Sequence, residues 1–192
     1  MASAVLIGAG LVVGVTALVL LHLLPTGLSP LRNAVSQYGI SRYRAGYRVQ
    51  TLAYAVAGAG AAIGVATLPG PAWPVVALCA TFAVTRAVIS WFPMDVPGTT
   101  RTRTGGRHGA LAVAAFLAAG LASREMANLL DKDGAHPGIA ATSSALAVLM
   151  ALSLIGMVVS RRVDLFGAAE RVFYVFMTGW LATVAVLVCL PG

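Results

Sequence analysis

The sequence predicts an all-α, polytopic membrane protein in which six transmembrane helices form one bundle over residues 1–192. The chain is 59% hydrophobic and only 10% charged, whereas soluble domains carry about a quarter charged residues. Six apolar runs have the length of roughly 20 residues that a helix needs to span a bilayer. None of them alternates with the period of two that a membrane β-barrel strand requires.

The first predicted span has no basic residue before it, so we interpret it as a retained helix and not as a signal peptide. Gly10 and Gly14 in this span, like Gly60 and Gly64 in the second, have a spacing that lets helices approach closely. The six expected spans, in order, cover residues 4–24, 49–68, 73–92, 109–130, 138–159 and 169–190.

The longest polar connection joins the first two spans. We expect residues 33–38 to form a short helix within it, capped by Ser29 and with Pro30 in its first turn. The alternation of Arg and Tyr over residues 41–48 is typical of anchoring at a membrane interface.

One arginine lies inside a predicted span. Arg86 comes six residues before Phe92, which places it about 9 Å from the end of the third span. Its side chain can reach the interface by snorkelling, or it can point into the bundle and meet a carboxylate such as Glu170.

The distribution of positive charge predicts the orientation. All but two of the 13 Lys and Arg residues fall at one side of the bundle, the exceptions being Arg124 and Lys132. Positive loops stay in the cytoplasm, so we expect the Arg-rich loops there and both termini outside. Only one of the 13 is a lysine, a bias that suggests a GC-rich bacterial genome and hence a bacterial inner membrane.

Two function classes are disfavoured. The net charge of +7 would fit nucleic acid in a soluble protein, but no basic stripe with interleaved aromatics is present, and loop arginines instead suit anionic lipid headgroups. Cys79 and Cys189 form no CxxC or Cys–His motif, so neither a disulfide framework nor a structural zinc site is expected.

The stretch between the third and fourth spans is the first place to expect a site. Asp95 and His108 bracket a loop rich in Arg and Thr there. We expect a polar pocket on the cytoplasmic side around this pair, with Arg86 or Glu170 within reach.

Several motifs spread along the chain resemble a known family. They are Leu-Ser-Pro at 28–30, Val-Ser-Gln-Tyr at 35–38, Phe-Pro-Met-Asp at 92–95, Gly-Gly-Arg-His at 105–108 and Gly-Ala-Ala-Glu-Arg-Val at 167–172. In these the sequence resembles the bacterial membrane family known as domain of unknown function 998. The resemblance implies a six-helix integral membrane protein of unassigned activity and supplies no reaction. It lends weight to Ser36, Asp95, His108, Glu170 and Arg171.

Three hypotheses of function remain open. The chain binds a lipid or serves as a subunit or accessory of a membrane assembly, alone or as a homo-oligomer; it is a membrane enzyme acting on a lipid or isoprenoid substrate; or it is a small transporter. In the enzyme, Asp95 and His108 act as acid and base, and a variant holds a metal between His22, Asp95 and His108. The sequence identifies no cofactor. The expected ligand- or headgroup-binding residues are Arg32, Ser36, Tyr38, Arg86, Arg107, Glu170 and Arg171.

Overall fold

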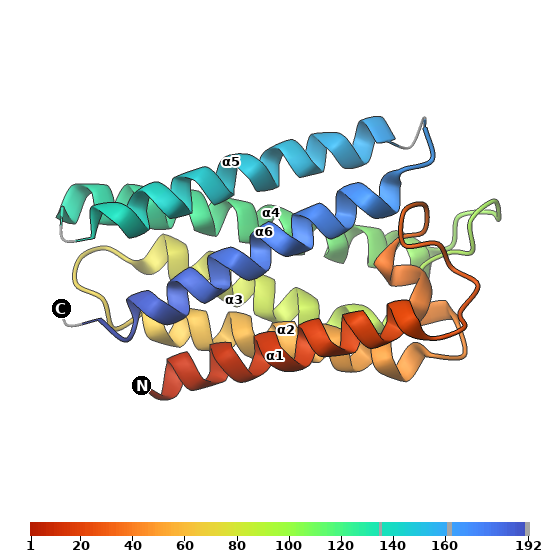
Figure 1. Cartoon of the computed structure of the whole chain (residues 1–192), viewed down its shortest axis with the longest axis horizontal. Coiled ribbons are helices and arrows are strands. Elements are labelled where there is room, and N and C mark those ends of the chain that lie inside the picture. The colour runs from red at the N-terminus through yellow and green to blue at the C-terminus, as the bar shows by residue number, and fades with distance from the viewer. Residues whose placement is uncertain (135, 161–162, 191–192) are drawn as a thin grey trace.

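The computed structural model describes residues 1–134, 136–160 and 163–190, and within these ranges it is helical with no strand. Six long helices run along one common direction (Figure 1). They are α1 (Ala2–Leu23), α2 (Arg44–Val65), α3 (Trp73–Val88), α4 (Arg103–Asp133), α5 (Pro137–Ser160) and α6 (Phe166–Leu187), with the short 3₁₀ helices η1 (Val35–Ile40) and η2 (Ile89–Trp91).

The helices follow the six predicted apolar runs in order, but several boundaries differ. Helix α4 begins six residues before its predicted start, because Thr102 caps it by accepting a hydrogen bond from the backbone N–H of Gly105. The short helix expected over residues 33–38 forms two residues later, as η1, and Ser29 does not cap it. Apolarity alone predicted these runs, and hydropathy does not register caps.

In the described part of the chain, five helices are long and apolar enough to cross a membrane: α1, α3 extended by η2, α4, α5 and α6. The chain is therefore of the multi-pass membrane type. Helix α2 is as long as α1 but less apolar, since it is rich in Gly and Ala and carries Gln50 and Thr51. The six predicted spans thus correspond to six long helices in the described residues, but only five of these helices meet the criterion for a span. The count of six spans is not confirmed.

Consecutive helices pack against each other from α1 to α6, and α6 also contacts α1 and α2. The start of α1 and the end of α6 lie at the same end of the bundle (Figure 1). The close contact predicted by the glycine spacing is present. A Cβ on Gly10 would lie 2.5 Å from the carbonyl oxygen of Ala53, so α1 and α2 touch backbone to backbone.

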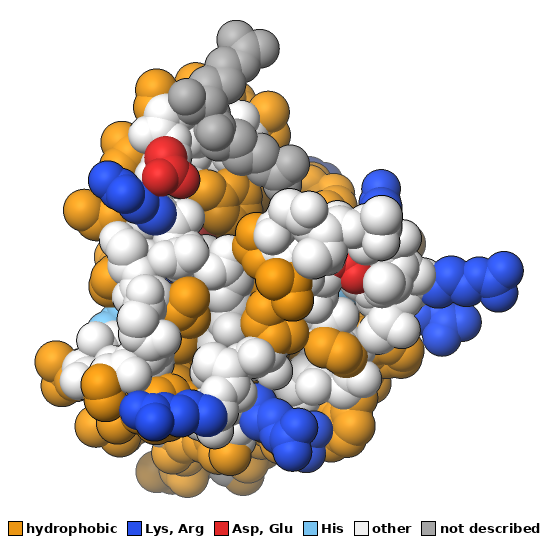
Figure 2. Space-filling view, turned by 90° about the vertical axis from the view of Figure 1, so that its right-hand side faces the viewer, with side chains coloured by type: hydrophobic (Ala, Val, Ile, Leu, Met, Phe, Trp, Pro, Cys, Tyr) orange, Lys and Arg blue, Asp and Glu red, His pale blue; other side chains and the backbone are white. Residues whose placement is uncertain are grey.

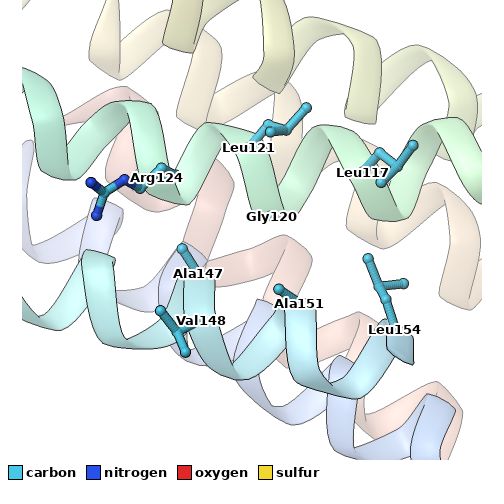
Figure 3. Close-up of a pocket in the computed structure, with 8 residues that line it drawn as sticks. All are labelled: Leu117, Gly120, Leu121, Arg124, Ala147, Val148, Ala151 and Leu154. Atoms are coloured by element: carbon cyan, nitrogen blue, oxygen red, sulfur yellow. The ribbon is translucent and has the colours of Figure 1, made fainter. Parts of the chain in front are cut away.

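The opposite end of the bundle carries the connections rich in arginine. Figure 2 views this end and shows Lys and Arg side chains spaced around its rim, with polar, backbone and hydrophobic groups in the middle. On the side of the bundle, a groove of about 330 Å³ lies between α4 and α5 (Figure 3).

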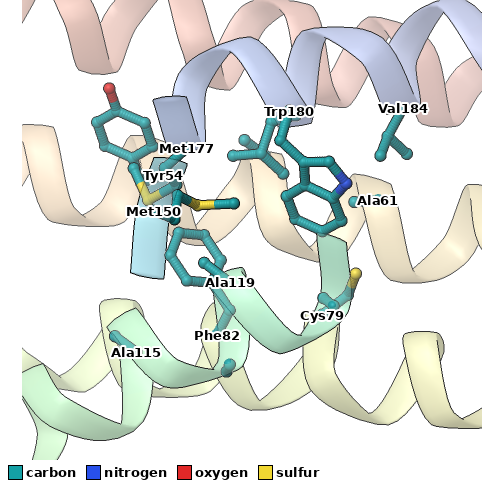
Figure 4. Close-up of a cluster of buried hydrophobic side chains, with 14 of the residues drawn as sticks. Tyr54, Ala61, Cys79, Phe82, Ala115, Ala119, Met150, Met177, Trp180 and Val184 are labelled. Atoms are coloured by element: carbon teal, nitrogen blue, oxygen red, sulfur yellow. The ribbon is translucent and has the colours of Figure 1, made fainter. Parts of the chain in front are cut away.

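The interior changes character along the bundle. Toward the chain termini it is apolar, where Trp180 and Val184 of α6 lie near Ala61, Cys79 and Phe82 (Figure 4). Cys79 is buried and Cys189 is exposed, and both thiols are free. Toward the Arg-rich end, polar side chains replace this apolar core.

Candidate functional site

Two helices present polar side chains to the interior at helical spacing. Helix α2 contributes Tyr47, Gln50 and Tyr54, and α6 contributes Glu170 and Tyr174. Positions three, four and seven apart share one face of a helix, so each set forms a stripe. All five side chains are buried, and Gln50 is 0% exposed.

Arg86 of α3 joins the two stripes. Its side chain is 2% exposed, and its Nη2 donates a hydrogen bond to Oε1 of Gln50 at 2.9 Å. The guanidinium also lies over the rings of Tyr54 and Tyr174, 5.9 and 5.6 Å from their centroids. Snorkelling was the wrong alternative, because the arginine points into the bundle. We call Tyr47, Gln50, Tyr54, Arg86, Glu170 and Tyr174 the buried polar cluster.

The charge of Arg86 has no direct counter-ion among the described residues. The only ion pair within 4.0 Å in that part of the chain joins Arg32 and Asp164, both exposed. Glu170 feels the guanidinium electrostatically, yet its Oε2 instead accepts a hydrogen bond from the backbone N–H of Val35, at 2.7 Å. The cluster therefore holds a buried cation whose hydrogen bond goes to the uncharged amide of Gln50.

Next to this cluster, Arg171 ties the first connection to α6. Its Nε donates to Nε2 of His22 at 2.6 Å, and its Nη1 donates to the carbonyl oxygens of Asn33 and Gly167, both at 2.9 Å. His22 accepts this bond through an unprotonated Nε2, so that nitrogen is not available to another group. The ring of His22 stands edge-on to that of Tyr38, with centroids 5.7 Å apart.

Several buried polar atoms at this end have no hydrogen-bond partner. Leaving a buried donor unpaired costs about 1–3 kcal/mol, so each such group calls for a ligand or an ordered water. The atoms are the hydroxyls of Tyr38 and Ser90, Nε2 of Gln50, Nε of Arg86 and Nη2 of Arg171. All five can donate, and two belong to cationic guanidinium groups.

Asp95 closes the connection between α3 and α4. Its carboxylate accepts hydrogen bonds from the backbone N–H and the hydroxyl of Thr102, at 3.2 and 2.6 Å. Thr102 in turn caps α4. A Cβ on Gly105 would overlap the Asp95 carboxylate, so the absence of a side chain there lets the carboxylate approach the N-terminus of α4. A negative charge near the N-terminus of a helix also interacts favourably with the helix dipole.

His108 holds the same connection from the other side. Its Nδ1 donates to the carbonyl oxygen of Phe92 at 2.7 Å, just after η2. Within the described residues, no hydrogen bond or ion pair joins Asp95 to His108, or either of them to Arg86 or Glu170. The expectation that Arg86 or Glu170 lies within reach of this pair therefore finds no support in a direct bond, although Arg86 and Asp95 both act electrostatically on His108.

The remaining predicted residues are dispersed. The Ser36 hydroxyl bonds to the sulfur of Met94 at 3.1 Å, and the exposed Arg107 lies 6.0 Å from the centroid of the Phe92 ring. His22, Asp95 and His108 do not assemble a metal site: the described residues contain no group of three potential ligands.

The sequence did not mark Gln50, Tyr54 and Tyr174 as site residues, and Tyr47 was assigned only to the interfacial pattern of residues 41–48. Gln50, Tyr54 and Tyr174 carry no charge and lie in apolar runs, so hydropathy does not distinguish them. Their regular spacing with Glu170 was the available signal, since it aligns polar groups on the inner faces of α2 and α6.

The fold and the buried polar cluster together define a class: a multi-pass helical membrane protein with a cationic, donor-rich interior near one end of its bundle. Within that class the chain belongs to the family described as "Protein of unknown function (DUF998)", whose model matches residues 6–187. The match confirms the family inferred from the motifs. No curated protein and no solved structure matches the chain.

Proposed function

We propose that the chain crosses a bacterial inner membrane six times, with the Arg-rich loops in the cytoplasm and both termini outside. In this topology α2 spans the membrane in addition to the five helices that meet the criterion for a span. Helix α2 lies between α1 and α3 in the packing order and turns its polar side chains inward. Its outer face is apolar instead, with Val49, Leu52, Val56 and Ile63 exposed. Side chains of this kind suit contact with lipid, and the bias of Arg to one end favours this orientation.

In this orientation the protein binds the anionic phosphate of a membrane lipid headgroup at the buried polar cluster. The observation that carries the proposal is Arg86, a buried guanidinium with no carboxylate within 4.0 Å among the described residues and with an unpaired Nε. Gln50 offers a second unpaired donor beside it. Guanidinium and amide N–H donors match the oxygen atoms of a phosphate.

A lipid is the favoured source of this phosphate because the cluster lies inside a bundle whose outer surface is apolar. The Arg side chains around the rim of the same end raise the local concentration of anionic headgroups. Binding of this kind is also compatible with a role as an accessory subunit of a membrane assembly.

The enzyme hypothesis needs Asp95 and His108 free to exchange protons with a substrate. Both side chains instead hydrogen-bond within the connection between α3 and α4. The geometry therefore favours binding over acid–base catalysis by this pair.

Native mass spectrometry of the protein released from native nanodiscs tests the proposal. The wild type is expected to retain an anionic phospholipid, and Arg86→Met to retain it about ten- to a hundred-fold less, the value of one or two charge-assisted hydrogen bonds. Arg107→Met is the matched control, because this exposed arginine lies outside the cluster. Retention equal in Arg86→Met and wild type would overturn the proposal.

A second measurement separates lipid from free phosphate. Delipidated protein in detergent is titrated with inorganic phosphate or with phosphatidylglycerol, and the melting temperature is followed. Stabilisation by phosphatidylglycerol alone supports the lipid source, whereas stabilisation by both indicates a site for the free anion.

A further inference from the structure

A groove between α4 and α5 lies on the outer surface of the bundle. It is formed by residues 117–124 of α4 and 147–154 of α5, and its volume of about 330 Å³ is at the low end for ligand sites. Leu117, Leu121 and Val148 line it and are each about half exposed. The groove is thus open to the surroundings of the bundle along an apolar wall (Figure 3).

The floor of the groove is made by small residues that leave space unfilled. Gly120 and Ala151 lie along it. A Cβ on Gly120 would meet no atom closer than 4.0 Å, in contrast to Gly10, where α1 and α2 touch. Gly120 therefore does not serve close helix contact, and the missing side chain adds to the open volume.

One cation stands at the end of this apolar groove. Arg124 is exposed, and its Nη1 donates to the hydroxyl of Ser144 on α5 at 2.9 Å. That bond fixes the guanidinium across the two helices. No carboxylate lies within 4.0 Å of it in the described part of the chain. A guanidinium has five N–H donors, so donors remain for an anion.

The depth of Arg124 fits a headgroup. It follows Arg103, the first residue of α4, by 21 positions, which is about 31 Å along the helix. The hydrocarbon core of a bilayer is about 30 Å thick. With the start of α4 at the Arg-rich interface, Arg124 reaches the opposite one, and the groove extends from it back toward the middle of the membrane.

We infer that this groove binds one anionic glycerophospholipid of the leaflet opposite the Arg-rich loops. One acyl chain lies between α4 and α5 over Gly120 and Ala151, and the phosphate contacts Arg124. The site is at the other end of the bundle from the buried polar cluster, so it does not depend on the function proposed there.

Photo-crosslinking tests this inference on the full-length protein. The protein is placed in phosphatidylcholine nanodiscs that contain a minor fraction of phosphatidylglycerol with a diazirine in its acyl chain, and labelled residues are mapped by mass spectrometry. Labelling is expected on both walls of the groove. Arg124→Gln should reduce it about five-fold, the value of one interfacial cation, and Ala151→Leu should abolish it by filling the groove.

Two control variants match these changes elsewhere on the surface. Arg103→Gln removes an exposed charge at the other end, and Ala80→Leu enlarges an exposed alanine on α3. Both should label as the wild type does. Three results would overturn the inference: labelling insensitive to Arg124→Gln and Ala151→Leu, equal competition by unlabelled phosphatidylcholine, or crosslinks showing a second copy of the chain in the groove.

Discussion

Replacing Arg86 and Gln50 together, by Met and Leu, is expected to raise the stability of the folded protein while it removes anion binding. Both side chains are buried, they bond to each other, and each has an unpaired donor, Nε of Arg86 and Nε2 of Gln50. Replacing both partners of a buried bond with apolar groups is close to neutral or stabilising.

The magnitude follows from the two unpaired donors. Each costs about 1–3 kcal/mol, and the double variant removes both. The contacts of the guanidinium with the rings of Tyr54 and Tyr174 are lost, at about 1 kcal/mol. The expected net gain is about 1–5 kcal/mol, and each kcal/mol corresponds to roughly 2–4 °C in melting temperature for a chain of this size.

Gln50→Leu alone is the informative comparison. It leaves Arg86 buried without its amide acceptor, which costs about 1.5–3 kcal/mol, and it removes the unpaired Nε2 of Gln50, which offsets part of that cost. The free energy of unfolding is therefore expected to lie below that of the double variant. Thermal unfolding of delipidated protein in detergent, followed by intrinsic fluorescence, measures all three proteins. A double variant that melts below both the wild type and Gln50→Leu would refute the reasoning, since it would mean that the polar pair stabilises the fold without a ligand.

Two glycine positions give further predictions from contact distances. Gly105→Ala should lower the free energy of unfolding by about 1–2 kcal/mol, because the new Cβ displaces Asp95 and disturbs the α4 cap. Gly106→Ala is the control and should leave stability unchanged, since the nearest atom to its Cβ is 3.9 Å away. Equal melting temperatures of the two variants would contradict the role given to Asp95. Gly10→Ala should lower the free energy of unfolding by about 1–3 kcal/mol, because the new Cβ pushes α1 away from α2. Gly8→Ala should not change it, since no atom lies within 4 Å of the new Cβ. A Gly10→Ala variant that melts at the wild-type temperature would show that the two helices can separate without loss of stability.

The sequence predicted the number and order of the long helices well because each is marked by an apolar run. It predicted their ends less well. The start of α4 at Arg103 depends on the Thr102 cap, and the cap depends on Asp95, seven residues earlier. These are contacts between polar groups, and the hydropathy of an apolar run does not predict them.

The sequence-based candidate site centres on Asp95 and His108, whereas the buried polar cluster lies on α2, α3 and α6. Asp95 and His108 attracted attention because they are titratable residues close together in the chain. Gln50 and Tyr174 are uncharged and 124 positions apart, yet Arg86 bonds to the first and lies over the ring of the second. Pairing between α2, α3 and α6 follows from how the helices pack, and a single sequence does not contain that information directly.

The order in which the helices are made gives the buried arginine a second significance. Tyr174 and Glu170 lie on α6, the last helix of the bundle, and Tyr174 leaves the ribosome about 90 residues after Arg86. At about 5–20 residues per second, that is an interval of roughly 4 to 18 seconds. Until α6 packs, the guanidinium lacks the wall that Tyr174 provides. In the topology proposed above, completion of α6 would therefore be the step that covers this cation.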